Sequence, residues 1–455
     1  MDKQMEYAKT NKDRFLNELF ECLKIESISA VPEKEQEVIA CGNWFCDKLK
    51  SIGVENVELK ETKGYPAVYG DLMKAGKDKP TLMVYGHYDV QPVDPIEKWD
   101  SPPFEPKIKD DYIYCRGVAD DKGQVLPHIF ALESILKTGG SLPFNLKVFI
   151  EGEEEAGTGG TEKFVEDNKD LLACDAVVLS DTAWMAHDKP TIIYALRGIV
   201  YYEVKFFGPS LDLHSGIYGG RVPNTLNVMA RVMSRLHDED WHIAISGIYD
   251  DVVPLSDDEK KSFAEVSISD DALKKEVGVD ALIGEKGFTS TERNWARPAL
   301  DINGVWGGYM DDGAKTVISA EGGFKVSMRI VPNQDPAKIT ELLKKYIKSI
   351  CPAGVRCEVE LLHSGKPVMV KRDGEFIKLA QDSIEKAFGM RPILVREGAS
   401  IPITETFKTS LKADSIMMGL GLSDDRIHSP NERFKVNHFF SGIDALIHFY
   451  TNAGK

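Results

Sequence analysis

Leu82-Met83-Val84-Tyr85-Gly86-His87-Tyr88-Asp89 joins a short apolar run to a glycine and a group of polar side chains. A continuous apolar run of this length is typical of a strand that is buried on both faces of a parallel sheet. A helical pattern follows at 125–136 and is closed by Gly139-Gly140. Further apolar runs lie at Leu146–Ile150, Ala176–Leu179 and Ile416–Met418. The succession of strand, helix and strand predicts an α/β fold with a mostly parallel sheet flanked by helices.

A different pattern begins near Gly198, where apolar and other residues alternate as in a strand with one wet face. Further elements are expected as helices at 224–236 and 337–350 and as strands at 324–331 and 355–362. They predict an inserted α+β lid and dimerisation domain at 198–366, within a catalytic domain formed by 1–197 and 367–455. The stretch 250–309 is polar and rich in glycine, and its pattern indicates no particular element.

The composition of the 455-residue chain narrows the class of protein. Its formal net charge of -16 argues against a nucleic-acid partner, because Lys and Arg are not in surplus to neutralise phosphates. The N-terminus has no apolar core of a signal peptide, and no apolar run approaches the ~20 residues that span a bilayer. The seven scattered cysteines lack a C-x-x-C pair, which suits a reducing compartment. We therefore expect a cytoplasmic protein without a membrane partner.

Polar side chains gather where the predicted strands end, which is where ligands bind in open parallel sheets. His87 follows the first strand, Glu151-Gly152-Glu153-Glu154-Glu155 the second and Ser180-Asp181 the third. Asp120-Asp121 stands at the start of the helix after the first strand. Crowded carboxylates repel one another unless some take up protons or a cation lies among them. A mixed set of histidine and carboxylate ligands favours zinc, with manganese or cobalt as alternatives, over magnesium and calcium.

Each of these motifs alone has a simpler explanation. An aspartate pair at a helix start is usually an N-cap, a glutamate run a solvated surface, and a single histidine a turn residue. Their joint occurrence at successive strand ends favours a metal site. The sequence contains no G-x-S-x-G elbow, no P-loop and no complete G-x-G-x-x-G. His128, His438 and His448 fall in helical patterns, where packing or solvent exposure is the expected role.

Six segments carry a specific resemblance, and three of them are His87-Tyr88-Asp89-Val90-Gln91-Pro92, Asp120-Asp121-Lys122-Gly123 and Glu151-Gly152-Glu153-Glu154-Glu155. The others are Leu213-His214-Ser215-Gly216, Arg396-Glu397-Gly398-Ala399-Ser400-Ile401-Pro402 and Ile427-His428-Ser429-Pro430-Asn431-Glu432. Together they resemble the zinc metallopeptidase family of carnosine dipeptidases, glutamate carboxypeptidases, aminoacylases and succinyl-diaminopimelate desuccinylase. The resemblance covers nearly the whole chain, and the nearest branch is that of the carnosine and cytosolic nonspecific dipeptidases.

The resemblance implies a site with two zinc ions. Asp120 would bridge the ions, and the other ligands would be His87 and Asp181 at one ion and Glu155 and His428 at the other. A cis peptide bond would follow Asp120. Two cations about 4 Å apart can hold a bridging hydroxide near neutral pH and polarise the scissile carbonyl.

The resemblance also implies the residues that handle protons. Glu154 would be the general base, which takes a proton from the water between the metals and passes it to the departing amine. Asp89 would orient the ring of His87 without binding metal. A shift of the alignment by one residue would instead make Glu153 the base and Glu154 the ligand. The match of Glu155-Ala156-Gly157 to the residues that follow the family's ligand favours the first assignment.

Four more residues would contact the substrate or the transition state. The partner subunit's His214 would stabilise the oxyanion, so a homodimer is expected. Arg329 would pair with the terminal carboxylate of the substrate, a match of fork to carboxylate. Ser400 and the partner subunit's Thr316 would add hydrogen bonds to that carboxylate. The implied reaction is hydrolysis of dipeptides, or of short peptides with a free C-terminal carboxylate.

Other functions remain open at this point. An aminoacylase, an N-acyl amino acid amidohydrolase or a carboxypeptidase would use the same metals and base with different substrate contacts. A catalytically silent metal-binding or scaffold protein would need the ligands but no general base, and the intact Glu154 argues against it.

Overall fold

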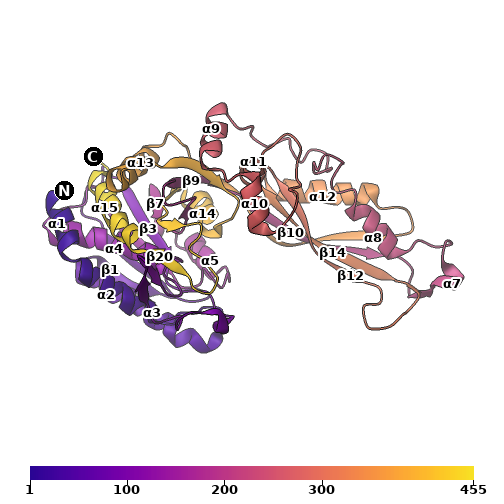
Figure 1. Ribbon diagram of the computed structural model, residues 1–455, viewed down its shortest axis with the longest axis horizontal. Coiled ribbons are helices and arrows are strands. Elements are labelled where there is room, and N and C mark those ends of the chain that lie inside the picture. The colour runs from indigo at the N-terminus through magenta and orange to yellow at the C-terminus, as the bar shows by residue number, and fades with distance from the viewer. The chain divides into compact units, whose positions relative to one another are not determined.

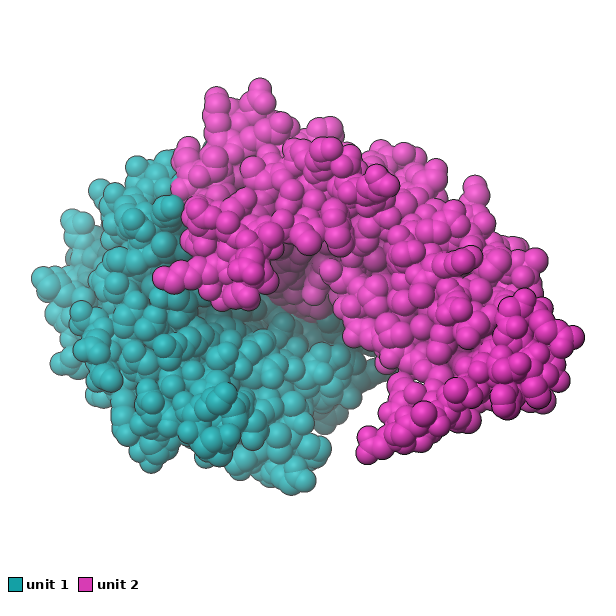
Figure 2. All heavy atoms as spheres, turned by 45° about the vertical axis from the view of Figure 1, so that its right-hand side comes forward, with its two compact units in different colours: residues 1–194, 370–395, 406–455 teal, residues 195–369, 396–405 magenta.

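The structure is a computed structural model that describes residues 1–455. The chain forms two compact units, which Figure 2 colours separately. Unit 1 consists of Met1–Tyr194, Val370–Val395 and Thr406–Lys455, and unit 2 of Ala195–Met369 and Arg396–Glu405. Residues 396–405, which the sequence pattern assigns to the first domain, belong to unit 2. Their hydrogen bonds explain this, because Arg197 donates to the backbone oxygen of Gly398 and Arg329 to the hydroxyl of Ser400.

A nine-stranded sheet runs through unit 1 in the order β1-β2-β6-β3-β7-β18-β9-β16, with β17 also paired to β9. Its strands are β1 (Glu55–Lys60), β2 (Ala67–Leu72), β3 (Thr81–His87), β6 (Asn145–Glu151), β7 (Ala176–Leu179), β9 (Thr191–Leu196), β16 (Val368–Met369), β17 (Ile393–Glu397) and β18 (Asp414–Met417). Neighbours among β6, β3, β7 and β18 are parallel, whereas β1, β2 and β9 are antiparallel to their neighbours. The predicted α/β fold is confirmed, with a sheet that is mixed. The short link at 61–66 cannot make a parallel crossover and forces β1 and β2 into a hairpin.

Helices cover both faces of this sheet (Figure 1). Helix α4 (Lys122–Lys137) links β3 to β6, and α5 (Gly160–Asp167) with α6 (Lys169–Leu172) links β6 to β7. These two right-handed crossovers run in opposite directions along the sheet, so their helices lie on opposite faces. The layer that contains α4 also includes α1 (Asp2–Thr10), α2 (Lys12–Leu23), α3 (Glu35–Ile52), α13 (Glu375–Phe388) and α15 (Val436–Asn452). Nearly every residue of α4 is buried, which explains its broad apolar pattern.

Shorter elements complete unit 1. They are the 3₁₀ helices η1 (Pro32–Lys34) and η2 (Ile96–Lys98) and the π-helix η3 (Phe407–Leu411). The π-helix follows α14 (Pro402–Thr406), of which all but Thr406 belongs to unit 2. Two small sheets pair β20 (Arg433–Lys435) with β5 (Tyr112–Tyr114) and β4 (Lys107–Lys109), and β19 (Gly421–Leu422) with β8 (Ala183–Trp184).

Unit 2 is built on a four-stranded antiparallel sheet in the order β12-β14-β10-β15. The strands are β10 (Gly198–Phe207), β12 (Ala299–Gly307), β14 (Glu321–Ile330) and β15 (Arg356–Gly365). Burial alternates strictly along β10, as the sequence pattern predicts. Helices α8 (Thr225–Met233) and α12 (Pro336–Ile350) pack with the buried side chains of β10 and β14 into one hydrophobic core. Two short strands, β11 (Leu213–His214) and β13 (Val317–Ile318), pair beside the four-residue helix α7 (Ser215–Tyr218).

The stretch 250–309 contains regular structure that its composition conceals. It forms α9 (Asp257–Val266), α10 (Asp270–Val277), α11 (Ser290–Ala296) and the edge strand β12. Capping boxes start two of the helices, with Ser256 and Glu259 at α9 and Thr289 and Glu292 at α11. These S/T-x-x-E patterns are readable signals of a helix start, but the helices they begin have only 10 and 7 residues.

Two further features bear on where the chain can work. Cys351 and Cys357 form a disulfide, which the sequence analysis did not anticipate. The five remaining cysteines are free thiols. None of the helices combines the length and the apolar character that crossing a bilayer requires.

Candidate functional site

The carboxyl ends of β3, β6 and β7 lie at one edge of the sheet, because these strands are neighbouring and parallel. His87 is the last residue of β3 and is fully buried. The residue before it has to be glycine, since a Cβ atom on Gly86 would lie 2.0 Å from Val125 and 2.7 Å from the Asp121 carboxylate. This close approach sets the start of α4 directly against the end of β3.

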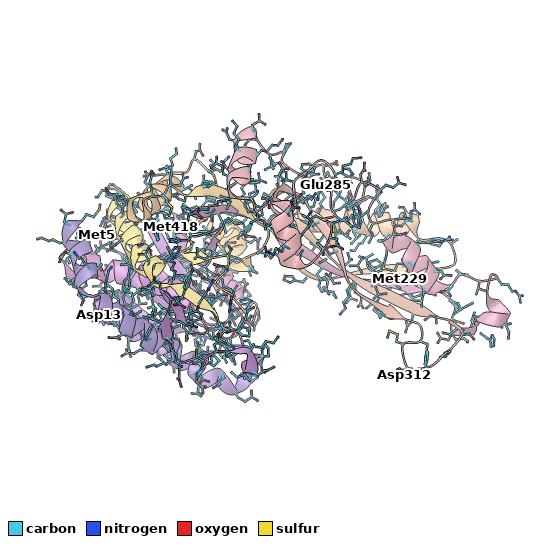
Figure 3. The ribbon with its side chains drawn as sticks, viewed as in Figure 1. Met5, Asp13, Met229, Glu285, Asp312 and Met418 are labelled. Carbon is cyan, nitrogen blue, oxygen red and sulfur yellow. A yellow bond between two sulfur atoms is a disulfide. The ribbon has the colours of Figure 1, made fainter.

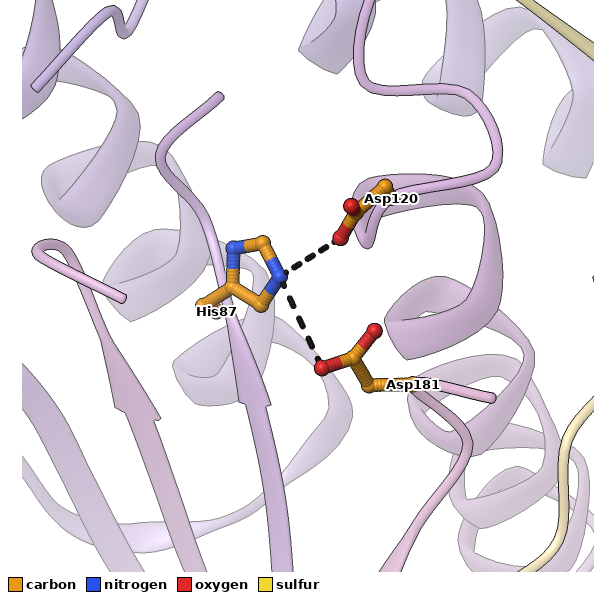
Figure 4. Close-up of side chains that lie close together, drawn as sticks. All are labelled: His87, Asp120 and Asp181. Atoms are coloured by element: carbon orange, nitrogen blue, oxygen red, sulfur yellow. Dashed lines mark hydrogen bonds and ion pairs between the residues drawn. The ribbon is translucent and has the colours of Figure 1, made fainter. Parts of the chain in front are cut away.

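The first cluster of potential ligands is formed by His87, Asp120 and Asp181 (Figure 4). Nε2 of His87 lies 2.9 Å from Oδ1 of Asp120 and 4.0 Å from Oδ2 of Asp181. The ligand atoms all lie within 4.8 Å of one another, so one cation can contact all three.

The second cluster shares Asp120 with the first and adds Glu155 and His428. Nε2 of His428 lies 2.9 Å from Oδ2 of Asp120 and 3.2 Å from Oε2 of Glu155. The two oxygens of the Asp120 carboxylate therefore face different histidines, as a carboxylate that bridges two cations would. The peptide bond between Asp120 and Asp121 is cis, as the resemblance implies.

The electrostatics of the clusters show why a cation fits there. Burial raises the pKa of Glu154 to about 9, and burial together with the nearby Asp120 raises the pKa of Asp181 to about 7. Hydrogen bonds to Asp120 and Glu155 raise the pKa of His428 to about 10. The carboxylates thus lack sufficient positive charge from the protein alone, and a divalent cation would supply it. Mixed nitrogen and oxygen donors suit a transition metal.

The three consecutive glutamates have different surroundings. The carboxylate of Glu153 turns away from the clusters and accepts hydrogen bonds from Thr158 (2.6 Å), Thr161 (3.0 Å) and the backbone of Tyr65 (3.2 Å). Glu155 faces His428. Glu154 is half-buried, and its carboxylate is influenced by residues of both clusters without belonging to either. This arrangement favours the assignment in which Glu154 is the base over the register shifted by one.

Asp89 is fully buried behind His87. Its Oδ1 lies 3.3 Å from Nδ1 of His87, and its backbone oxygen lies 3.1 Å from the same nitrogen. Its other carboxylate oxygen accepts hydrogen bonds from Ser29 (2.5 Å) and from the backbone N–H of Glu155 (3.0 Å). Asp89 therefore connects a residue of each cluster. Gln91 adds a 2.7 Å hydrogen bond to the Glu155 carboxylate.

Glu432 is a site residue to which the sequence analysis gave no role. Its buried carboxylate accepts hydrogen bonds from Nη1 of Arg116 (2.7 Å) and from the backbone N–H groups of Gly117 (2.9 Å), Ala119 (2.8 Å) and Asp120 (3.2 Å). It thereby fixes the segment that carries the shared aspartate. The segment Ile427-His428-Ser429-Pro430-Asn431-Glu432 contains the signal, since His428 and Glu432 both act on Asp120.

The expected substrate residues lie in unit 2. Nη1 of Arg329, on β14, donates to the Ser400 hydroxyl at 3.1 Å, and Ser400 donates to the backbone oxygen of Arg197 at 2.6 Å. His214 and Thr316 are both exposed and lie side by side, because β11 pairs with β13 and the backbone N–H of Ser215 donates to the oxygen of Thr316. Nδ1 of His214 accepts a hydrogen bond from Gly216 at 3.0 Å, which leaves Nε2 to carry the proton of the neutral ring.

The helical histidines do not belong to either cluster. His128 is buried, with ring nitrogens 2.6 Å from the Tyr450 hydroxyl and 2.7 Å from the Ser180 hydroxyl. His438 is buried and lies within hydrogen-bond distance of the backbone oxygen of Leu420 and of His187. Both have packing roles, as expected.

Comparison with known proteins gives consistent matches. The sequence profile described as Peptidase family M20/M25/M40 matches residues 83–452. The Cys-Gly metallodipeptidase DUG1 of Candida albicans is 33% identical, over 97% of this chain and 96% of the relative. The human Beta-Ala-His dipeptidase is 29% identical, over 99% of this chain and 92% of the relative. The M20 family metallo-carboxypeptidase Sso-CP2 from Sulfolobus solfataricus has a similar structure, with a TM-score of 0.81 and 31% identity over 96% of this chain and 98% of that one.

Proposed function

Because this chain belongs to peptidase family M20/M25/M40, we propose that it is a metal-dependent hydrolase of dipeptides. The observation that carries the proposal is the shared aspartate, since Asp120 lies 2.9 Å from the ring nitrogen of both His87 and His428. Relatives that match nearly the whole chain are named dipeptidases, which favours dipeptides over N-acyl amino acids or longer peptides.

We propose that each subunit binds two zinc ions, with manganese or cobalt as substitutes. His87, Asp120 and Asp181 would hold one ion, and Asp120, Glu155 and His428 the other. When bound, the ions would polarise the scissile carbonyl and lower the pKa of the attacking water. The buried Asp89 would keep Nε2 of His87 directed at its ion by holding the ring from the other side.

Glu154 would serve as the general base and then as the acid. Its carboxylate would take a proton from the attacking water and deliver it to the nitrogen of the departing amine. Burial suits it for this double task, because a raised pKa makes its carboxylate a stronger base towards water, and the basic amine that departs can still accept the proton. The hydrogen bonds that turn Glu153 away support this choice of residue.

The residues of unit 2 would bind the rest of the substrate. Arg329 and Ser400, which are joined by a 3.1 Å hydrogen bond, would bind the terminal carboxylate of the substrate. The partner subunit's His214 would donate a hydrogen bond from Nε2 to the oxyanion, and the partner subunit's Thr316 would add a hydrogen bond to the carboxylate. That the two residues are exposed next to each other supports a shared role in a second copy of the site.

We propose a homodimer, because His214 and Thr316 would act in the site of a partner subunit. The edge strand β12 exposes Ile302 and Val305, 39% and 54% accessible, beside unpaired backbone groups that another chain can cover.

Mixing His214→Ala with Glu154→Ala tests the sharing of residues between subunits. A 1:1 mixture should regain about a quarter of wild-type turnover, since half of the dimers are mixed and one of the two sites in each is complete. The exchange of subunits has to be verified first. If turnover then does not recover, the sites are not shared between subunits.

The reaction itself is tested with a dipeptide library on zinc-loaded enzyme. Free dipeptides should be hydrolysed, and their N-acetylated forms and tripeptides should be poor substrates. Chelation should abolish turnover, and added zinc should restore it. Preference for N-acetylated substrates would instead identify an aminoacylase, and release of single C-terminal residues from longer peptides a carboxypeptidase.

We also propose the cytoplasm as the working compartment, because five cysteines are free thiols and four of these are buried. The Cys351–Cys357 disulfide argues in the opposite direction, since disulfides persist mainly in oxidising compartments. Alkylation of the protein in intact cells, followed by mass spectrometry, decides the matter: both cysteines should be alkylated if the compartment is reducing.

A further inference from the structure

Unit 2 contains a pocket that none of the proposed catalytic or substrate-binding residues lines. Its volume is about 470 Å³, within the range of small-molecule sites, and all of its lining residues come from unit 2. Its walls are formed largely by the stretch 273–301, including the loop that carries Glu285 (labelled in Figure 3). Residues between 237 and 243, which follow α8 in the chain, contribute the remainder together with Arg197.

One wall of the pocket carries a buried cation. Arg197 is only 8% exposed, and its guanidinium donates to the backbone oxygen of Gly398 and to the side-chain oxygen of Asn294, each at 2.9 Å. Both acceptors are neutral, and no ion pair of the structure includes Arg197. Burial and the neighbouring Arg329 lower its pKa to about 10, so the surroundings disfavour its charge. A guanidinium in such a position gains most from a bound anion.

Of the two other arginines in the pocket, one forms an ion pair with a carboxylate and the other does not. Arg297 pairs with both carboxylate oxygens of Glu285, at 2.8 Å and 2.5 Å, and lies over the rings of Tyr249 and Phe288. Arg293 donates to the backbone oxygen of Glu285 at 2.8 Å and has no carboxylate partner. The pocket thus presents two guanidinium groups without an ion pair, although the more distant carboxylates of Glu397 and Asp301 partly offset the burial of Arg197. Asp301 also lines it but does not form an ion pair with either arginine.

Much of the remaining lining is apolar, although His237 and Ser290 also contribute polar side chains. Ile243 and Leu300 are buried, 4% and 5% exposed, and form the inner wall. Trp241 and Ile283 are 47% and 67% exposed, although both are large apolar side chains. Exposed apolar groups beside one buried and one half-buried guanidinium fit a ligand with an anionic head and an apolar body.

We propose that this pocket binds a small organic acid, with its carboxylate on Arg197 and Arg293 and its apolar body against Ile243 and Leu300. The pocket shares no residue with the two clusters of potential metal ligands, and its existence does not depend on the proposed dipeptidase activity. A carboxylate matches the planar fork of each guanidinium.

The test is calorimetric titration of zinc-loaded, full-length protein with hexanoate and with 3-phenylpropionate. The uncharged amides of the two acids are matched controls for the apolar body. Either acid should bind to the wild type, and Arg197→Met should weaken that binding at least about tenfold, the loss of one charge-assisted pair. Arg231→Met, on the exposed face of α8, removes the same charge outside the pocket and should leave the affinity unchanged.

Two more variants keep the test decisive. Arg293→Met changes a half-buried residue and should also weaken binding, so it serves if Arg197→Met fails to fold. His428→Ala removes a proposed metal ligand, and the carboxylate should bind this variant as it binds the wild type. Loss of binding in His428→Ala would assign the heat to the metal site and overturn the proposal. It would equally be overturned if neither acid bound at about 10 mM or if the amides bound as well as the acids.

Discussion

Replacing Glu432 by glutamine tests whether one buried carboxylate holds the segment that carries Asp120. The substitution keeps the size of the side chain and removes its charge. Glu432 is completely buried, and its partner Arg116 is 1% exposed at the side chain. Three backbone N–H groups, from Gly117, Ala119 and Asp120, also point at this carboxylate. The variant therefore leaves a buried guanidinium without a counterion and weakens the hydrogen bonds that position the shared aspartate.

The magnitude follows from these contacts. Removing one partner of a buried ion pair costs about 3–5 kcal/mol. Because glutamine keeps one acceptor oxygen, we expect the lower end, a loss of about 3 kcal/mol in the free energy of unfolding. Residues that support metal ligands typically change metal affinity by about 10–100-fold, and we expect the Kd for zinc to rise by that factor.

Two measurements check these values. Urea unfolding of metal-free protein gives the stability, and competition with a chromophoric chelator gives the Kd for zinc. Glu385→Gln is the matched control, because Glu385 pairs with Arg391 at 2.6 Å while both side chains are about half exposed, at 48% and 47%. That variant should lose no more than about 0.5 kcal/mol and keep its zinc affinity. If Glu432→Gln lost stability but bound zinc as tightly as the wild type, the idea that Glu432 positions Asp120 would be wrong.

Three further predictions concern single residues. Glu154→Gln should lower kcat by about 10²–10⁴-fold with unchanged zinc content, measured by turnover and elemental analysis; a smaller loss would argue against a general base. His428→Ala should retain one zinc ion per subunit and lose the more weakly held one in dialysis, and retention of both would contradict the ligand assignment. His128 has its pKa lowered to about 3 by burial, against 6.5 when unfolded, so it stabilises the fold fully above pH 6.5. As the pH falls from 6.5 towards 3, His128 is protonated in the unfolded chain but not in the folded chain. The free energy of unfolding therefore falls by up to about 1.4 kcal/mol per pH unit. Urea midpoints measured against pH should fall less steeply in His128→Gln.

Much of the site could be predicted because its residues stand next to secondary structure that the sequence reveals. His87 ends an apolar strand, Asp120 precedes a broad helical pattern, and Asp181 follows another apolar strand. Parallel neighbours deliver such residues to one edge, so position in the chain translates into position in space. The bridging role expected of Asp120 and the cis bond after it are implied by the resemblance to a family, and no periodicity predicts either of them.

Other features could not be predicted, for physical reasons. The segment that ends at Glu432 resembles a family motif, but nothing in it indicates that the Glu432 carboxylate accepts a hydrogen bond from the backbone of Asp120, 312 positions away. The Cys351–Cys357 disulfide depends on where a helix ends and a strand begins, which brings the two Cα atoms to 6.7 Å. The helices of 250–309 are short, and their stability comes from packing such as the edge-to-face contact of Phe263 with Trp295, which propensity does not report.

The place of β18 in the sheet has a consequence for biosynthesis. This strand, Asp414–Met417, lies between β7 and β9, although both of those are complete by residue 196. A nascent chain therefore exposes two unsatisfied strand edges in the middle of its largest sheet until more than two hundred further residues have left the ribosome. His428 emerges later still, so the second cluster of potential metal ligands cannot form in any ribosome-bound intermediate that ends before it. A premature stop near residue 400 would thus yield a split sheet that is prone to aggregate, instead of a slightly shorter enzyme.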